Sequence, residues 1–318
     1  MPILLLTNTR DVTTDLVINE IKFRNLDFLR INSDYLAEAL PTFRFQSHQP
    51  SLTLAYKGIT VDASSITSAY LRRPLLDELA KGHEADVYYK FGEWRALLQS
   101  IYSELRGRWL NEPHCIEMAE NKVRQLQIAN SLGFLIPRTV VSNNPTEVAK
   151  FVARHPSIAK PLRSGSLGAS TRPEIVFTTR LYSIDDIDFD SINVAPFIVQ
   201  EEIPKSADIR VTVVGESIFA TKIDSQEHEE STVDWRRGDV REMKYSIYHL
   251  PEYLKNSCVS LVKALGLRFG AIDLVLDRSQ RHWFLEINPN GQWGWIQMKT
   301  GQPIAGAIVD ELLAISAS

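Results

Sequence analysis

The hydrophobic pattern of the chain predicts alternating strands and helices in its first third. A continuous apolar run at 3–6 is followed by a helical pattern at about 15–24 and by a second apolar run at 28–31. A strand, a helix and a second strand at this spacing indicate a βαβ unit with a parallel sheet. The pattern then predicts a hairpin at 51–60, a strand at 69–71, a helix that ends near 106 and a short strand at 109–111.

The remainder of the chain predicts strands in larger number, with fewer helices between them. Gly133 and Gly266 follow helical patterns at about 119–132 and 251–265, as is typical of helix ends. We predict strands at 138–142, 157–161, 174–178, 197–201, 209–214 and 217–223, a helix opened by Asn144-Pro145, an amphipathic helix at 303–313, and loops at 163–172 and 224–239. The fold class is therefore α/β, with α+β character in the C-terminal part.

The most informative pattern is an apolar segment, 270–290, which is interrupted by a polar turn and carries acidic residues. It predicts a β-hairpin. If residues 278–281 form the loop, Asp273 lies opposite Glu286. The same register puts Asp277 opposite His282.

Period-two alternation places Asp273, Glu286 and Asn288 on one face of this hairpin. Two carboxylates directly opposite each other, roughly 5 Å apart, repel and destabilise a sheet unless a cation lies between them. Oxygen ligands with one amide favour Mg²⁺ or Mn²⁺ over zinc. The alternative is a solvated acidic rim, which the apolar flanking residues disfavour.

Basic residues precede this hairpin at positions that suit phosphate. Lys160 ends a predicted strand, and the Gly- and Ser-containing loop after it lets backbone N–H groups approach phosphate closely. Asp208 and Arg210 share one face of another strand. Arg210 suits an anionic group or a cross-strand ion pair, and the sequence leaves both open. There is no GxxxxGK[ST] motif and no protein-kinase motif set.

Length, charge and cysteine content argue against several classes of protein. A length of 318 residues indicates two or three lobes, and a formal net charge of −4 argues against binding nucleic acid by bulk electrostatics. Cys115 and Cys258 have no metal-ligand spacing and do not indicate a disulfide framework. The apolar runs are too short to span a membrane. The first residues predict a buried strand and not a signal peptide, so we expect a cytoplasmic protein.

In this order the segments resemble the ATP-grasp superfamily. The matching residues are Lys122, Ala159-Lys160-Pro161, the small-residue loop after it, Val199 to Ile203, Asp208-Ile209-Arg210, Asp273 and Glu286 to Pro289. More narrowly, Arg72-Arg73-Pro74, Asp234-Trp235-Arg236 and Glu286 to Trp293 resemble the microviridin-type peptide ligases, which cyclise ribosomal precursor peptides into graspetides.

The resemblance implies an ATP-grasp fold with three domains. These are an N-terminal Rossmann-like pre-ATP-grasp domain at 1–115, a central α+β domain at 116–203 and a C-terminal antiparallel-sheet domain at 204–318 that carries the metal site.

The resemblance also implies roles for individual residues. Lys122 and Lys160 would contact ATP phosphates, Glu201 and Ile203 would frame adenine through their backbone, and Asp208 would lie near the ribose or the substrate. The implied set of nucleotide-binding residues is Lys122, Lys160, Ser164, Gly165, Gln200, Glu201, Glu202, Ile203 and Asp208. The remaining implied roles are Asp273, Glu286 and Asn288 for two Mg²⁺ ions (or Mn²⁺), Lys160 and Arg210 for catalysis, and Arg72, Arg73, Asp234, Arg236 and Asp186 for substrate.

The implied activity is ATP-dependent ligation within a peptide. An Asp or Glu side chain of a ribosomal precursor peptide would be activated as an acyl phosphate and joined to a Thr or Ser hydroxyl or a Lys amine. Segment 179–193, with Asp186 on its acidic face, would hold the leader of that peptide, or it is a solvated linker. Relatives imply a homodimer.

Two other functions stay open. The first is a ligase that adds a free amino acid to a protein or to a small-molecule carboxylate. The second is a non-catalytic peptide-binding module.

Overall fold

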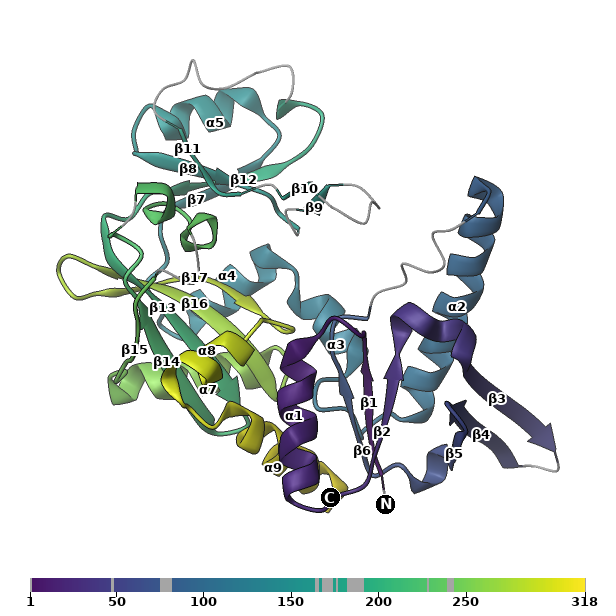
Figure 1. Ribbon diagram of the computed structural model, residues 1–318. Helices are drawn as coiled ribbons and strands as arrows, with labels where there is room; N and C mark the ends of the chain where they lie inside the picture. The colour runs from purple at the N-terminus through teal and green to yellow at the C-terminus, as the bar shows by residue number, and fades with distance from the viewer. Residues whose placement is uncertain are drawn as a thin grey trace.

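The computed structural model describes residues 2–46, 49–74, 82–163, 166–167, 174–175, 177–181, 192–227, 229–238 and 243–317. They form an N-terminal lobe, a central lobe and a C-terminal lobe (Figure 1). The central lobe stands above the other two in this view, and the two chain ends lie near each other at the bottom.

The N-terminal lobe contains the predicted βαβ unit. β1 (Ile3–Thr7) pairs in parallel with β2 (Phe28–Asn32) and with β6 (Ser68–Leu71), and α1 (Val12–Phe23) connects the first two. Alternate β1 side chains enter two different apolar clusters, Leu4 and Leu6 in one and Ile3 and Leu5 in the other. The strand is therefore buried on both faces, which explains its continuous apolar run.

An antiparallel sheet extends from this lobe. It consists of β3 (Ala39–Gln46), β4 (Gln49–Tyr56) and β5 (Ile59–Asp62), flanked by the short 3-10 helices η1 (Ser33–Glu38) and η2 (Ala63–Ser65). The predicted hairpin is confirmed: Lys57 and Gly58 both have positive φ, 50° and 80°, as a two-residue turn of this kind requires. Strand β3 is missing from the sequence prediction.

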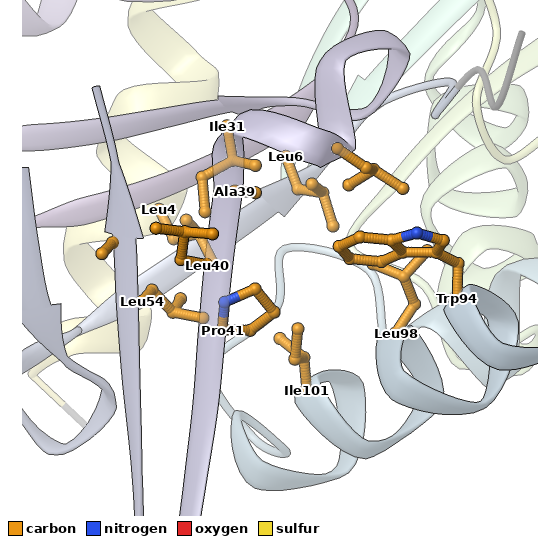
Figure 2. A pocket seen from close by; sticks show the side chains of 12 residues that line it. Leu4, Leu6, Ile31, Ala39, Leu40, Pro41, Leu54, Trp94, Leu98 and Ile101 are labelled. Carbon is orange, nitrogen blue, oxygen red and sulfur yellow. The ribbon is translucent and has the colours of Figure 1, made fainter. Parts of the chain in front are cut away.

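The long helix α2 (Glu84–Glu104) packs against the two sheets of the lobe. Its residues Trp94, Leu98 and Ile101 face Leu4 and Leu54 across an apolar cavity of about 20 Å³ (Figure 2). This cavity is too small for a nucleotide, so it belongs to the core of the lobe. The predicted strand at 109–111 is reduced to one bridge between Ala69 and Trp109.

Two short helices connect the N-terminal lobe to the others. They are α3 (Pro113–Ala119) and α4 (Lys122–Ser131). The sequence predicts one helix from about 119, but α3 ends at Ala119 and α4 begins at Lys122. The Asn121 side chain caps α4 by accepting a hydrogen bond from the Arg124 N–H at 3.0 Å.

The central lobe is a four-stranded antiparallel sheet in the order β11-β8-β12-β7, with α5 packed on it. Its elements are β7 (Thr139–Ser142), α5 (Pro145–Val152), β8 (Ser157–Lys160), β11 (Thr179–Leu181) and β12 (Phe197–Glu201). A separate two-stranded sheet consists of β9 (Ser166–Leu167) and β10 (Glu174–Ile175). The predicted loop at 163–172 therefore contains two strand residues, and β10 lies at the start of the predicted strand at 174–178.

The C-terminal lobe is an antiparallel sheet in the order β15-β14-β13-β16-β17. Its strands are β13 (Lys205–Val214), β14 (Ser217–Ile223), β15 (Tyr245–Ile247), β16 (Phe269–Asp277) and β17 (His282–Asn288). Its helices are η5 (Glu229–Ser231), η6 (Trp235–Arg237), α7 (Glu252–Ala264), α8 (Gly294–Thr300) and α9 (Ile304–Ser316). The predicted loop at 224–239 contains η5 and η6, and its Ser225, Ser231 and Asp234 are buried.

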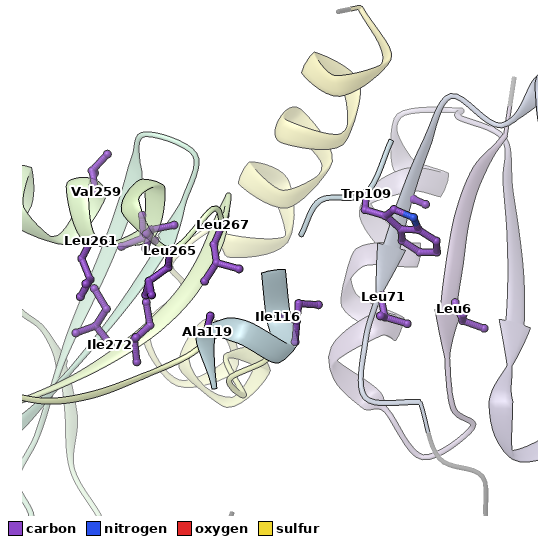
Figure 3. Packing of buried hydrophobic residues seen from close by; sticks show 14 of the residues in the cluster. Leu6, Leu71, Trp109, Ile116, Ala119, Val259, Leu261, Leu265, Leu267 and Ile272 are labelled. Atoms are coloured by element: carbon purple, nitrogen blue, oxygen red, sulfur yellow. The ribbon is translucent and has the colours of Figure 1, made fainter. Parts of the chain in front are cut away.

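One apolar cluster joins the N-terminal and C-terminal lobes. Leu6, Leu71 and Trp109 lie at one end of it, and Leu261 and Ile272 lie at the other (Figure 3). Ile116 and Ala119 of α3 lie between these ends. The two lobes therefore share a core, which fixes α3 and α4 against the C-terminal sheet. Within the described ranges, no helix is both long and apolar enough to cross a membrane.

Candidate functional site

The acidic hairpin has the predicted pairing at its centre. Asp273 of β16 lies directly opposite Glu286 of β17. The predicted pairing of Asp277 with His282 is wrong, because His282 lies opposite Leu276. The Asp277 N–H donates to the Arg281 carbonyl at 2.9 Å, so the loop is 278–280, one residue shorter than predicted. A bulge after Asp273 leaves Leu285 unpaired and restores the register at the acidic pair.

Each carboxylate of this pair contacts a cation from a neighbouring element. Arg210 of β13 donates from Nη1 to Asp273 Oδ2 at 2.6 Å, so the cross-strand ion pair that the sequence left open is present. Lys122 at the start of α4 lies 3.1 Å from Glu286 Oε2 and also donates to the Pro161 carbonyl at 3.1 Å. β13 and α4 therefore each supply a cation to one of the two carboxylates on β16 and β17.

The surroundings shift the pKa values of the two carboxyl groups in opposite directions. Burial raises the pKa of Asp273, with Arg210 opposing and the nearby Glu286 carboxylate adding to the rise. Burial acts in the same sense on Glu286, but Lys122, Lys160 and Arg236 outweigh it and lower its pKa to about 2. Glu286 is thus firmly ionised and surrounded by positive charge.

Lys160 ends β8 as predicted, and its ammonium is buried. It donates to Gln200 Oε1 of β12 at 3.0 Å, and Gln200 in turn donates to Thr139 Oγ1 at 2.8 Å. Burial lowers the pKa of Lys160 to about 8; Lys122 and Arg236 add to the fall and Glu286 opposes it. A bound anion would stabilise the charged form of this side chain.

Asp208 and Asp234 form a second pair of buried carboxylates. Asp208 accepts from Lys205 Nζ at 2.6 Å and from Ser225 Oγ at 2.5 Å. Asp234 accepts from Nε and Nη2 of Arg236 at 2.8 and 2.7 Å. These bonds anchor the segment that the sequence predicts as a loop.

Half of the predicted site residues line one cavity of about 240 Å³. The predicted residues that line it are Lys122, Lys160, Gln200, Asp208, Asp234, Arg236, Asp273, Glu286 and Asn288. Among the described residues no group of three His, Cys, Asp or Glu gathers to hold a metal. The oxygen set offered to a metal here is therefore two carboxylates and one amide.

Other predicted residues lie elsewhere. The side chains of Glu201 and Ile203 line a separate groove with Arg138 and Trp283, while Glu202 pairs with Arg180. Ser164, Gly165 and Asp186 lie outside the described residues. The role that the resemblance gives to the backbone of Glu201 and Ile203 stays a prediction.

The Arg72-Arg73 pair holds the chain that follows β17. Arg72 is completely buried; it lies 3.6 Å from Asp11 and donates to the Asn290 carbonyl and, at 3.0 Å, to Gln292 Oε1. Arg73 is exposed and donates to the same carbonyl at 3.2 Å. A substrate contact for either side chain stays a prediction, and for Arg72 it would require the buried guanidinium to become accessible.

Sequence reasoning missed two amides that hold the hairpin. Asn111 donates to the carbonyls of Phe269 and Pro289 at 2.8 and 3.1 Å and accepts from the N–H of Arg268 and of Phe269. Gln125 does the same at Ile287. A possible signal for Gln125 was its position three residues after Lys122, on the same face of a helix.

A larger cleft adjoins the cavity. It measures about 1100 Å³, lies between α2 and α3, and shares Arg163 with the cavity that contains Lys160. Tyr88, Arg95 and Tyr102 of α2 line it.

Comparison with known proteins finds similarity to ATP-grasp enzymes. The sequence profile described as the RimK-like ATP-grasp domain matches residues 119–312. A probable alpha-L-glutamate ligase of Pseudoalteromonas translucida is 29% identical over 207 residues, which are 63% of this chain and 65% of that protein. The chain therefore spans about 65% of the length of this relative.

Two solved structures are similar over nearly the full length. A RiPP-associated ATP-grasp ligase of Chryseobacterium gregarium, in complex with ADP and a leader and core peptide, has a TM-score of 0.88 at 25% identity and covers 99% of this chain and 97% of its own. The macrocyclase MdnC of Microcystis aeruginosa, bound with precursor peptide MdnA, has a TM-score of 0.85 at 27% identity, with 98% and 99% covered. These similarities confirm the predicted ATP-grasp fold and the resemblance drawn from the motifs.

Proposed function

The chain belongs to the RimK-like ATP-grasp family, whose profile matches more than half of its residues, and from this we propose that it is an ATP-dependent, ADP-forming peptide ligase. It activates an Asp or Glu side chain of a ribosomal precursor peptide and joins it to a Thr or Ser hydroxyl or a Lys amine of the same peptide. The observation that carries the proposal is the Asp273–Glu286 pair, which lies in one cavity with Lys122 and Lys160.

The donor set of the cavity fits magnesium. Asp273, Glu286 and Asn288 offer hard oxygen atoms on adjacent strands, and the two carboxylates would repel each other without positive charge nearby. We propose that these three residues hold two Mg²⁺ ions or Mn²⁺. Magnesium bound there would neutralise negative charge on the ATP phosphates.

The cationic side chains of the cavity are proposed to bind the phosphates. Lys122 comes from α4 and Lys160 from β8. Gln200 holds the Lys160 ammonium at 3.0 Å, so that this group is positioned before any anion arrives. The backbone from Gln200 to Ile203 is proposed to frame adenine, with Asp208 near the ribose.

The reaction proposed for these residues has two steps. A carboxylate oxygen of the peptide attacks the γ-phosphorus of ATP; the bond to the β-phosphate oxygen breaks, and an acyl phosphate and ADP result. A peptide hydroxyl or amine then attacks the acyl carbon and loses its proton, phosphate leaves, and an ester or amide forms. Lys160 and Arg210 would offset the negative charge that accumulates in these steps, each contributing about 3 kcal/mol.

The peptide needs a surface next to the cavity, and the cleft between α2 and α3 provides one. Arg163 lines both the cleft and the cavity, and the cleft is much larger than a nucleotide alone requires. Arg236 and Asp234 line the cavity itself and are proposed to contact the reacting part of the peptide. A homodimer, the leader contact at Asp186 and a cytoplasmic location remain predictions.

A second function is supported by the curated relatives. They are named glutamate ligases, so addition of free glutamate to a carboxylate is the alternative acceptor chemistry. Internal ligation is favoured here because the two peptide-bound structures resemble nearly the whole chain, whereas the sequence matches to glutamate ligases cover between 63% and 80% of it.

Mass spectrometry distinguishes these functions. The purified protein is incubated with ATP, magnesium, glutamate and a peptide encoded beside its gene. Ligation within the peptide removes one water for every bond formed, whereas glutamate addition increases the mass by one residue. Absence of both products and of ADP release would favour a non-catalytic peptide-binding module.

A further inference from the structure

The strand that carries two of the proposed magnesium ligands lies at the edge of its sheet. β17 is the last strand in the order β15-β14-β13-β16-β17. An edge strand presents backbone N–H and C=O groups that have no partner strand and that can move or pair elsewhere. Glu286 and Asn288 therefore depend on whatever holds the outer side of β17.

A single side chain takes the place of a neighbouring strand at this edge. Gln125 of α4 donates from Nε2 to the Ile287 carbonyl at 2.8 Å, and its Oε1 accepts from the Ile287 N–H at 3.0 Å. Ile287 lies between Glu286 and Asn288. The Gln125 amide thus makes both hydrogen bonds that a paired backbone would make, at the one residue between the two ligands.

The Gln125 amide is buried and fully used. Gln125 is only 2% exposed, and its Nε2 also donates to the Ala119 carbonyl at 2.7 Å. That third bond ties the amide to the end of α3, which belongs to the core shared by two lobes. Because all three polar groups of the amide have partners, its orientation is fixed.

The same helix turn also contacts the neighbouring ligand. Lys122 and Gln125 are three residues apart on α4, so both face β17, and Lys122 lies 3.1 Å from Glu286 Oε2. One further bond secures the outer edge, from the Phe284 N–H to the Leu135 carbonyl at 2.8 Å. Asn111 donates to the Pro289 carbonyl at 3.1 Å, just beyond the end of β17. Only the Gln125 bonds, among those named here, hold the residue that lies between the two ligands.

We infer that Gln125 is a positioning residue that fixes Glu286 and Asn288 for magnesium by holding the backbone of Ile287. The inference rests on the proposed function, because it presupposes a metal at these residues. Groups that orient metal ligands without touching the metal typically affect metal affinity or activity by 10- to 100-fold.

The test compares Gln125→Met with Gln302→Met. Methionine keeps the length and most of the volume of glutamine but has no amide. Gln302 is a matched control because it is also buried, accepts from Thr221 Oγ1 at 2.9 Å and donates to the Ala220 carbonyl at 3.4 Å. Its bonds lie at β14, which β13 and β16 separate from β17.

The first readout needs neither nucleotide nor metal. Hydrogen–deuterium exchange of the segment 282–290 is measured in the free protein. We expect the Gln125→Met protein to exchange the Ile287 amide at least about tenfold faster, and the Gln302→Met protein to exchange it at the wild-type rate. Gln125→Asn, which shortens the amide arm, should change exchange in the same direction if methionine prevents folding.

The second readout is calorimetric binding of ADP with and without magnesium. Gln125→Met should weaken ADP binding about 10- to 100-fold in magnesium and leave metal-free ADP binding unchanged. The inference would be overturned if the Gln125→Met protein exchanged the Ile287 amide at the wild-type rate and bound ADP with the wild-type dependence on magnesium. It would also be overturned if Gln302→Met caused an equal loss of amide protection and of ADP affinity. If the wild-type protein itself binds no ADP in magnesium, the proposed function fails, and the inference fails with it.

Discussion

Lys122 Nζ lies 3.1 Å from Glu286 Oε2 and joins the first turn of α4 to the edge strand of the C-terminal sheet. The same ammonium reaches the Pro161 carbonyl, one residue after Lys160. Lys122 of α4 and Lys160 of the central sheet therefore lie in one cavity with the Glu286 carboxylate. The low pKa of Glu286, about 2, reflects this gathering of charge.

Glu286→Gln should abolish ATP-dependent modification while the protein stays folded. The substitution keeps the shape of the side chain but removes the charge that the two lysines surround, and it removes a proposed magnesium ligand. ADP release and thermal unfolding measure the two effects. Glu216→Gln is the control, because that exposed carboxylate pairs with Lys263 at the surface. Near-normal turnover in Glu286→Gln would rule out the metal assignment.

Arg210→Ala should lower turnover more than it weakens ATP binding. The guanidinium is buried against Asp273 and lies beside the proposed metal site, so its charge matters most when negative charge accumulates in the transition state. We expect kcat to fall about 100-fold, which corresponds to about 3 kcal/mol. Arg210→Lys keeps the charge and should recover part of the loss. An unchanged kcat in Arg210→Ala would remove the residue from the mechanism.

Nucleotide binding should weaken as the pH rises above about 8. The pKa of Lys160 is about 8, so the side chain carries its charge below that pH and loses it above. In magnesium-free ADP titrations between pH 7 and 9 we expect a progressive loss of affinity in the wild-type protein. Lys160→Arg should flatten this profile, because arginine stays protonated throughout the range. A wild-type profile that is flat over the same range would show that Lys160 does not bind phosphate.

Asp277 should stabilise the hairpin turn at neutral pH and cease to do so in acid. Its carboxylate accepts from the N–H of Ser279 and Arg281 and from Trp283 Nε1. Although burial opposes the shift, these bonds lower its pKa to about 2 from 3.8. The native state therefore binds fewer protons than the unfolded state between these values, so the stabilisation is complete above about pH 4 and is lost as the pH falls toward 2.

Urea unfolding of Asp277→Asn measures this contribution. We expect a loss of about 1–2 kcal/mol at pH 7, and a smaller difference from wild type at pH 3. Arg278→Ala, a change in the same turn, is the control. An equal difference at both pH values would contradict the assignment of the acid sensitivity to Asp277.

Gly291→Ala should reduce both stability and turnover. A Cβ at this position would meet the side chain of Ala271 and would lie 2.6 Å from Arg210 Nη2. Overpacking of this kind costs about 1–3 kcal/mol, and here it would displace the guanidinium from Asp273. Thermal unfolding and kcat should fall together, whereas Gly301→Ala, at a position with open space, should lose stability through its φ of 72° and keep kcat. Wild-type kcat in Gly291→Ala would show that Arg210 tolerates displacement.

The centre of the site was predictable because it depends on local alternation. The pairing of Asp273 with Glu286 follows from the period of two in each strand, and the strand end at Lys160 follows from the loop composition after it. The prediction survived an error in the turn only because the unpaired Leu285 compensates for a loop that is one residue shorter than predicted. A bulge of this kind has no clear signal in the sequence.

The supports of the site were not predictable from local pattern. Gln125 contacts a residue 162 positions away, and Asn111 contacts residues 158 and 178 positions away. Their importance arises from backbone groups that the fold leaves at the edge of β17. The burial of Arg72 likewise depends on Asp11 and Gln292, which become neighbours only when the N-terminal and C-terminal lobes share a core.

The proposed function depends above all on Asp273, Glu286 and Asn288, which are proposed to hold the metal that binds the ATP phosphates. The most direct measurement is a crystal structure of the protein with Mn²⁺ and a non-hydrolysable ATP analogue, with the metal located by anomalous scattering. We expect an anomalous peak about 2.1–2.3 Å from oxygen atoms of these residues and of the phosphates. A peak elsewhere, or a nucleotide bound with these side chains still paired only to Arg210 and Lys122, would contradict it.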